Sequence, residues 1–190
     1  MRLDHIAYRV KDRKKTAQFF IDAFGYTIQQ EFTINFDNGE TADCIALEPP
    51  EKTGPLVPWT GQVLPPWNTD SYFGYDIVDN ANYHLPPEIF VSDGTPGSIV
   101  NKWVLERNGI GGIHHIAYQV EDVEATMQMW TEKGYAEFAS EKPLSCDDVI
   151  QIFTKPSELT GVIFEFIKRG KHGFCKNNVK ALMESSQDFK

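Results

Sequence analysis

The chain has 190 residues, of which 41% are hydrophobic and 24% charged, and its formal net charge is -9 at pH 7. This composition is typical of a globular protein, and the length suits one large domain or two small ones. An acidic chain lacks the basic face that phosphate groups require, so nucleic acid is not an expected partner. No apolar run approaches the roughly 18 residues of a membrane-spanning helix, so we expect no membrane association.

The cysteines and the N-terminal segment bear on the cellular compartment. Cys44, Cys146 and Cys175 are widely spaced and form no CxxC motif. The sequence opens on a strand pattern and not on the charged and apolar regions of a secretory signal. We therefore expect three free thiols and a reducing, cytoplasmic location.

A short segment of the sequence occurs twice. Residues 4–10 read DHIAYRV and residues 114–120 read HHIAYQV, so five of the seven positions are identical and one histidine keeps its place. The repeat continues after this segment, because three further residues recur at the same spacing: Asp12, Thr16 and Gln18 match Asp122, Thr126 and Gln128. The repetition predicts two copies of one structural module.

The first module is expected to span residues 1–110, opening with a strand over 3–10. Asp12 can cap a helix that ends at Gly25, because apolar residues between them follow helical spacing. These residues are Ala17, Phe20, Ile21 and Phe24. Three further strands are expected at about 26–35, 41–48 and 88–92.

Residues 49–87 interrupt the first module and contain eight of the eleven prolines. Proline at this density precludes regular strands and helices. The segment also carries six aromatic residues: Trp59, Trp67, Tyr72, Phe73, Tyr75 and Tyr83. Two interpretations stay open, a segment that folds over a ligand and one that pads the sheet or a homodimer contact.

The second module is expected over residues 111–170, with a strand at 113–120 and a helix between Asp122 and Gly134. Three strands should follow, at about 135–140, 148–154 and 161–168. Residues 171–190 predict a C-terminal lid helix, capped by Asn177, with an apolar stripe of Val179, Leu182 and Met183. The pattern βαβββ, present twice, predicts an α+β fold with curved mixed sheets around a shared metal cavity.

Strand alternation selects the candidate metal ligands. His5 shares a strand face with Ala7 and Arg9, and His115 holds the equivalent place in the second module. The same alternation turns His114 to the opposite face and makes it a structural residue. We therefore predict that His5 and His115 face each other across the cavity.

One carboxylate stands in the last strand of each module. Glu165 lies between Phe164 and Phe166, and charged residues seldom occupy such an apolar strand unless they are paired or bind metal. Glu88 is assigned the corresponding place in the first module, with pairing to an arginine or lysine as its alternative role. Two histidines with Glu165 alone match non-haem iron(II) sites that have open positions. Glu88 as a fourth ligand would favour redox-silent proton transfer with a Lewis-acid metal.

Four segments of the second half resemble a known family. Residues 112–117 read GIHHIA, 151–156 read QIFTKP, 164–169 read FEFIKR, and 173–182 carry a GF…N…KAL pattern. The paired modules resemble the vicinal oxygen chelate superfamily, and these motifs are most similar to the catalytic domain of 4-hydroxyphenylpyruvate dioxygenase. Residues 3–7 and 100–109, with Glu88, look more like methylmalonyl-CoA epimerase.

The resemblance implies roles for individual residues. His5, His115 and Glu165 would be iron ligands, and the substrate would meet side chains of the last strands and the lid. These side chains are Gln151, which would orient the substrate, with Phe153, Phe174 and Asn178.

Three functions follow as alternatives. The favoured one is an Fe(II)-dependent dioxygenase that acts on a small 2-oxo acid. The second is a glyoxalase- or epimerase-type isomerase or lyase with Zn, Co or Ni, in which Glu88 is a ligand or the general base. The third is a metal-free module that binds small molecules such as antibiotics.

Overall fold

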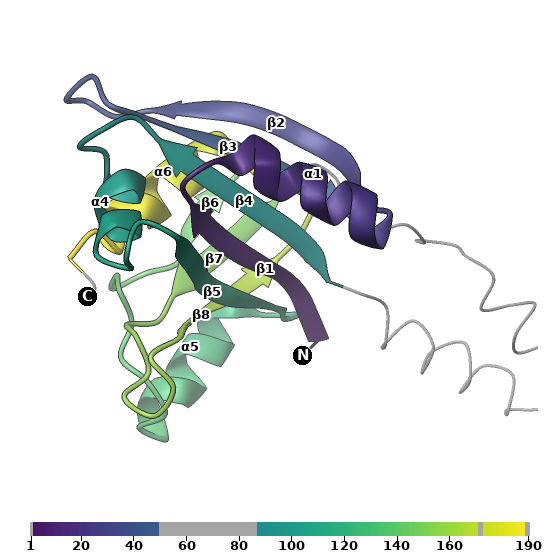
Figure 1. The fold of residues 1–190 in the computed structure, drawn as a ribbon. Coiled ribbons are helices and arrows are strands. Elements are labelled where there is room, and N and C mark those ends of the chain that lie inside the picture. The colour runs from purple at the N-terminus through teal and green to yellow at the C-terminus, as the bar shows by residue number, and fades with distance from the viewer. Residues whose placement is uncertain (1, 50–86, 171–172, 189–190) are drawn as a thin grey trace, which may run out of the picture.

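The computed structural model describes residues 2–49, 87–170 and 173–188. These residues form one mixed sheet of eight strands, which curls around a central space, and four helices pack against it (Figure 1). The strand order is β2-β3-β4-β1-β5-β8-β7-β6. The predicted α+β fold is therefore confirmed. Most of the insertion, residues 50–86, lies outside the described residues.

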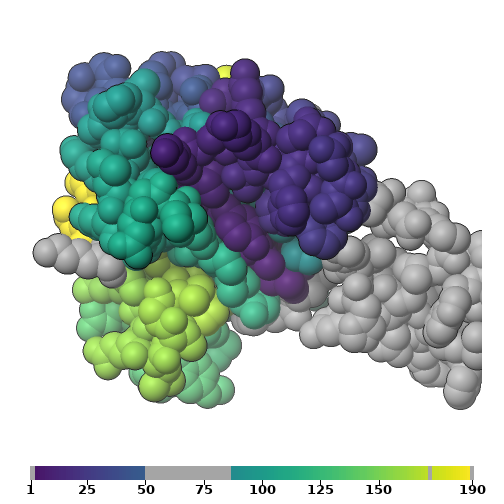
Figure 2. Space-filling model, viewed as in Figure 1, coloured from purple at the N-terminus to yellow at the C-terminus, as the bar shows by residue number. Residues whose placement is uncertain are grey.

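Each half of the sheet comes from one half of the chain. The first four strands are β1 (Arg2–Val10), β2 (Thr27–Asn35), β3 (Thr41–Glu48) and β4 (Glu88–Gly94). The other four are β5 (Gly111–Gln119), β6 (Leu144–Cys146), β7 (Val149–Phe153) and β8 (Ile163–Lys168). Figure 2 shows the purple-to-teal first half above the green second half on one face of the molecule.

The two halves meet at their first strands. β1 pairs antiparallel with β5, while β1 pairs parallel with β4 and β5 pairs parallel with β8. The repeat in the sequence therefore corresponds to a repeat in the strand pairing. The two copies are related by a twofold axis through the seam between β1 and β5. Across this seam His5 pairs with Ala117 and Ala7 pairs with His115, so the inner-face histidine of each half lies beside the alanine of the other.

Both predicted repeat helices form where the sequence places them. α1 (Arg13–Phe24) begins after Asp12, whose side chain accepts a hydrogen bond from the Lys15 amide, and ends at Gly25 with φ 75°. α5 (Val123–Glu132) begins in the same way after Asp122. The α1 helix packs on the outer face of the sheet, against Ile6, Tyr8 and Val10 among others.

Two further helices lie nearer the central space. α4 (Ile99–Leu105), capped by Ser98, connects the halves and was not anticipated. α6 (Lys176–Ser185) is the predicted tail helix, and its stripe of Val179, Leu182 and Met183 is buried as expected. Its N-cap is Cys175 and not Asn177, which lies inside the first turn.

One expected strand is absent. Residues 135–140 make a single bridge, from Phe138 to Thr154, and the edge strand β6 forms later, at Leu144–Cys146. Tyr135 and Glu137 are exposed, so this stretch buries too little apolar surface to sustain a strand.

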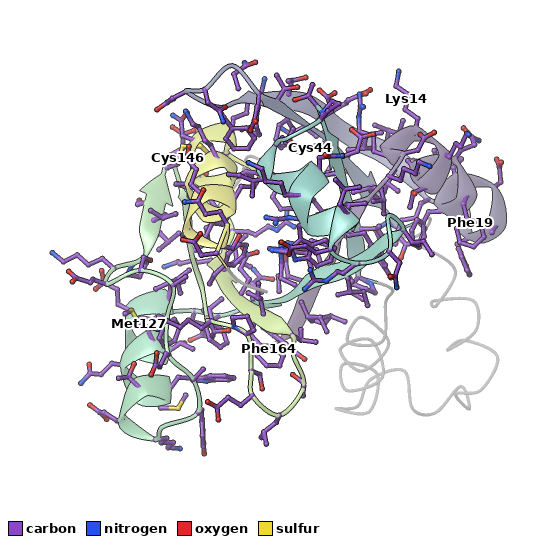
Figure 3. All side chains as sticks on the ribbon, turned by 60° about the vertical axis from the view of Figure 1, so that its left-hand side comes forward. Lys14, Phe19, Cys44, Met127, Cys146 and Phe164 are labelled. Carbon is purple, nitrogen blue, oxygen red and sulfur yellow. A yellow bond between two sulfur atoms is a disulfide. The ribbon has the colours of Figure 1, made fainter. Side chains whose placement is uncertain are left out.

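The expectation of three free thiols is wrong. Cys146 on β6 and Cys175 at the start of α6 form a disulfide, and Cys44 is free and buried. Figure 3 shows Cys146 beside the yellow α6. Sequence spacing cannot reveal this pair, because the fold brings together two segments 29 residues apart. The thiol argument for a cytoplasmic location no longer holds. Among the described residues, no helix is long and apolar enough to span a membrane.

Candidate metal centre

Three side chains from three strands converge inside the curled sheet. His5 on β1 lies 3.2 Å from His115 on β5, measured between their Nε2 atoms. The Glu165 carboxylate on β8 lies 3.0 Å from Nε2 of His115 and 3.5 Å from Nε2 of His5. All three side chains are buried. The structure therefore brings together the three residues that strand alternation and the family resemblance single out as candidate ligands.

Strand register explains this convergence. His5 pairs with Ala117 and Ala7 pairs with His115 across the β1–β5 seam, while Ala117 pairs with Glu165 on β8. Paired residues on neighbouring strands point to the same face of a sheet. The small side chains of Ala7 and Ala117 leave room between the larger ones.

Charge in this buried cluster is strongly coupled. Burial opposes a charge on His5, but the Glu165 charge and a hydrogen bond to Asp4 outweigh burial and raise the His5 pKa to about 9. Burial likewise raises the pKa of Glu165, and the charge of His5 with the hydrogen bond from His115 brings it down to about 2. The carboxylate is thus ionised, with the imidazolium of His5 as its counter-charge.

Asp4 orients the first histidine from a β-bulge. The β1–β5 register shifts between Leu3 and His5, and the extra residue, Asp4, turns its carboxylate 2.7 Å from Nδ1 of His5. Burial raises the Asp4 pKa, but His5 and Arg169 bring it to about 2, so the carboxylate can only accept. In the neutral imidazole, Nδ1 of His5 therefore carries the proton and Nε2 offers a lone pair to the cavity.

A second bulge corrects the expectation for His114. The register shifts again between Ala7 and Tyr8, which leaves His114 as an extra residue of β5. The bulge turns its side chain inward, where Nδ1 lies 2.9 Å from Nδ1 of His115. Burial lowers the His114 pKa well below its usual value, so the ring is neutral. Regular alternation fails here because a bulge adds one residue to one strand.

The assignment of Glu88 as the counterpart of Glu165 is also corrected. In the second half Ala117 pairs with Glu165, and in the first half the equivalent Ala7 pairs with Phe90. Glu88 lies two residues earlier, beside His5, and its carboxylate accepts a hydrogen bond from Arg169 at 2.7 Å. The position symmetric to Glu165 is therefore occupied by a phenyl ring.

The guanidinium of Arg169 binds the carboxylates of both Asp4 and Glu88. Its guanidinium donates to both oxygens of Asp4, with Nε 3.0 Å from each, and also to Glu88. The three side chains form a chain of charge-assisted hydrogen bonds that ends on His5. Glu88 thus has the paired role that stood as its alternative, and it reaches the cluster only through Arg169 and Asp4.

A small apolar pocket adjoins the cluster. The predicted residues Gln151, Phe153 and Phe174 line it, as do Val179 and Leu182 of α6. Phe174 sits edge-on to His5 at 5.0 Å between ring centres, and Phe153 lies 4.6 Å from His115. Oε1 of Gln151 is buried without a hydrogen-bond partner, so it can accept one from a ligand in this pocket.

The fourth predicted substrate residue, Asn178, lies elsewhere. Its amide donates to the Val149 carbonyl of β7 at 3.3 Å and so ties α6 to the sheet. It does not line the pocket. The disulfide provides a second tether at the start of the same helix.

The cluster fits a divalent metal. Adjacent ligands with metal bonds of about 2.1 Å lie about 3 Å apart, close to the separations seen here. The second Glu165 oxygen, Oε1, is buried without a partner. Among the described residues, no other histidine, cysteine or carboxylate joins this group. The donor set that fits a metal is thus two imidazoles and one carboxylate.

Sequence reasoning missed the residues that act on the ligands. Asp4 and His114 each directly precede a predicted ligand, and this adjacency was the available signal. Strand alternation argued against both, because it assigns neighbours to opposite faces. Arg169 follows Glu165 by four residues, which keeps it on the same strand face, yet β8 itself ends at Lys168.

Comparisons with solved structures reveal the same fold. One match, a methylmalonyl-CoA epimerase, has 21% identity and a TM-score of 0.59, and covers 90% of this chain and 97% of that one. A mutant of 4-hydroxymandelate synthase from Streptomyces coelicolor has 18% identity and a TM-score of 0.69, and covers 98% of this chain but 53% of that one. The methylmalonyl-CoA epimerase of Mycobacterium tuberculosis matches with 19% identity, a TM-score of 0.58, and coverage of 89% and 88%.

At this identity the likeness establishes the fold alone, and among curated proteins none matches the sequence significantly. A family profile is more decisive, because it covers well over half of the chain, from residue 4 to residue 149. Members of that family bind small molecules and are mostly metal-dependent enzymes. The chain belongs to the Glyoxalase/Bleomycin resistance protein/Dioxygenase superfamily, the vicinal oxygen chelate proteins.

Proposed function

We propose that the protein is an Fe(II)-dependent dioxygenase that acts on a small 2-oxo acid. The observation that carries this proposal is Phe90, which occupies the position symmetric to Glu165 and offers no ligand atom. Two histidines and one carboxylate are the ligand set of non-haem Fe(II) oxygenases, whose remaining positions take substrate and oxygen. A four-ligand set would leave too few open positions for both.

The charge of the site suits such a substrate. With His5 and His115 neutral and Glu165 ionised, a divalent ion in the cluster leaves one net positive charge. A 2-oxo acid brings one negative charge and two adjacent oxygens, so binding neutralises the buried site.

In the proposed reaction the 2-oxo acid loses CO2. One oxygen atom of O2 enters the carboxylate that replaces the ketone, and the other is added to the substrate. A bound Fe(II) ion would supply the activation of O2. Gln151 orients the substrate with its free amide oxygen, while Phe153 and Phe174 keep water out.

An isomerase or epimerase is the second candidate, because the chain matches a methylmalonyl-CoA epimerase over nearly the whole length of both proteins. This candidate would use Zn, Co or Ni. It is disfavoured by Glu88, whose carboxylate is held by Arg169 and not by the cluster. The metal-free binding module is the third candidate, and it predicts protein without bound metal.

One set of measurements separates these functions. The protein is purified without oxygen, its metal is identified, and oxygen uptake is measured with arylpyruvates and other 2-oxo acids. Solvent-proton exchange into 2-acyl thioesters is measured in parallel. Iron with substrate-dependent oxygen uptake supports the proposal, whereas another metal with proton exchange and no uptake supports the second candidate. Full metal occupancy in His115→Ala would refute the site.

A further inference from the structure

A second small cavity lies beside the metal pocket and holds a buried positive charge. Arg9, Ser92 and His114 are among its polar lining residues. The two cavities share five lining residues: Phe90, His115, Phe153, Val179 and Leu182. The two cavities are therefore neighbours that share one wall.

Arg9 is 3% exposed and has no counter-ion among the described residues. Its Nη2 donates to the Ser186 hydroxyl at 3.2 Å, and its guanidinium lies 5.8 Å from the Trp103 ring centre. Its Nη1 is buried without any hydrogen-bond partner. A guanidinium keeps its charge in proteins, and a buried charge without a partner is strongly unfavourable. The free Nη1 donor therefore indicates an anionic ligand.

His114 adds a second unpartnered nitrogen to the same cavity. Its Nδ1 lies 2.9 Å from Nδ1 of His115, and its Nε2 is buried without a hydrogen-bond partner. The His114 ring centre lies 5.5 Å from that of Trp103, and the Arg9 guanidinium lies 5.8 Å from the same indole.

We propose that Arg9 and His114 form an anion subsite that receives a second carboxylate of the substrate, at the end of the cavity away from the metal. The small cavity favours a planar carboxylate, whose oxygens match the donor geometry of arginine. Phe90, Phe153 and Leu182 make the walls between the two ends apolar. The substrate class is then a 2-oxo acid with an aliphatic spacer and a terminal carboxylate. This substrate assignment rests on the proposed function, whereas the anion subsite rests on the contacts of Arg9 and His114.

The test compares two six-carbon acids that differ only at the far end. 2-Oxoadipate carries a terminal carboxylate and 2-oxohexanoate a terminal methyl group. Their affinities are measured by calorimetry on Fe(II)-loaded protein under argon, where no turnover occurs. We expect the wild type to bind 2-oxoadipate at least tenfold more tightly than 2-oxohexanoate. Equal affinities in the wild type would overturn the proposal without any variant.

Two arginine variants locate the effect. Arg9→Met removes the charge at similar volume and should abolish the preference while leaving the affinity for 2-oxohexanoate nearly unchanged. Arg107→Met is the matched control, because Arg107 stacks on Trp103 at 3.7 Å but does not line the cavity. It should keep the full preference. A preference that survives in Arg9→Met would show that Arg9 is only structural, held by Ser186.

A metal-independent measurement separates this proposal from the proposed function. In chelator-treated protein, pentanoate should raise the melting temperature of the wild type and of Arg107→Met, but not that of Arg9→Met. This result, together with no iron binding, would reject the dioxygenase and keep the anion subsite. An equal rise in all three proteins, or no rise in any, would reject the subsite.

Discussion

Asp4 and His114 occupy the same position in the two repeats, and each lies within hydrogen-bond distance of Nδ1 of the histidine that follows it. The separations are 2.7 Å for Asp4 and 2.9 Å for His114. Both residues are the extra residue of a β-bulge in the β1–β5 pair, one in each strand. Asp4 and His114 are therefore related by the twofold symmetry of the seam, as are the candidate ligands His5 and His115 that they contact. One of these contacting groups is a carboxylate and the other an imidazole.

Replacing Asp4 should weaken metal binding without removing a ligand. Asp4→Asn keeps the size of the side chain but loses the charge that fixes the His5 tautomer and binds Arg169. Loss of such an orienting partner costs 10- to 100-fold in metal affinity, measurable by competition with a chelator. Asp12→Asn, on the exposed cap of α1, is the control and should bind normally. Unchanged affinity in Asp4→Asn would rule out the orienting role.

The two strand carboxylates should behave oppositely. Glu165→Gln removes the charged ligand, so purified protein should contain little metal and its melting temperature should no longer rise when iron is added. Glu88→Gln changes only a partner of Arg169 and should keep near-stoichiometric metal. Metal analysis of both proteins after identical purification gives the answer. Metal loss in Glu88→Gln equal to that in Glu165→Gln would restore the four-ligand site.

Phe90 should control the reaction class. Phe90→Glu places a carboxylate at the position symmetric to Glu165, and we expect a four-ligand site that binds zinc more tightly and loses substrate-dependent oxygen uptake. Phe90→Leu keeps three ligands and should retain uptake, with a modest loss of stability because the ring packs 4.9 Å from Phe174. Anaerobic zinc titration and an oxygen electrode measure both effects. Normal uptake by Phe90→Glu would refute this account of the open positions.

The disulfide should stabilise the oxidised protein. Cys146 and Cys175 close a loop with a sequence separation of 29, for which chain entropy predicts roughly 3–4 kcal/mol. The paired Cys146→Ser, Cys175→Ser variant should therefore unfold at lower denaturant concentration than the oxidised wild type. A variant as stable as the oxidised wild type would contradict a formed bond.

Thiol titration gives an independent measurement of the same bond. In the folded oxidised protein no thiol should react, because burial raises the pKa of Cys44 and shields it from reagent. One thiol should appear on unfolding, and three on unfolding with reductant. Two reactive thiols in the untreated folded protein would show that the bond is absent.

Strand alternation and helix caps predicted much of the fold. Asp12 and Asp122 begin their helices as expected, and parity alone preferred His115 to His114 as the partner of His5. Strand alternation, however, predicts only the face of the sheet on which a side chain lies. It does not predict which residues of neighbouring strands pair. Glu88 and Phe90 share a face on β4, so the sequence could not decide which of them lies opposite Ala7.

The remaining errors come from features without a local sequence signal. A bulge inserts one residue between regular pairs, so alternation placed His114 on the wrong side of β5. Cys146 and Cys175 meet only because α6 folds back into the curl of the sheet. The charge of Arg9 becomes informative only once its burial is known, because a strand arginine is ordinarily solvated.

A metal bound at the candidate centre would connect the two halves of the chain across the seam between β1 and β5. His5 belongs to one half of the chain, and His115 and Glu165 belong to the other, so neither half alone carries the complete ligand set. An ion bound by all three residues would bind only when the two halves are packed together. Its binding free energy would therefore add to the stability of the contact between the halves. Without that ion, we expect the β1–β5 pair to separate before the outer strands of the sheet.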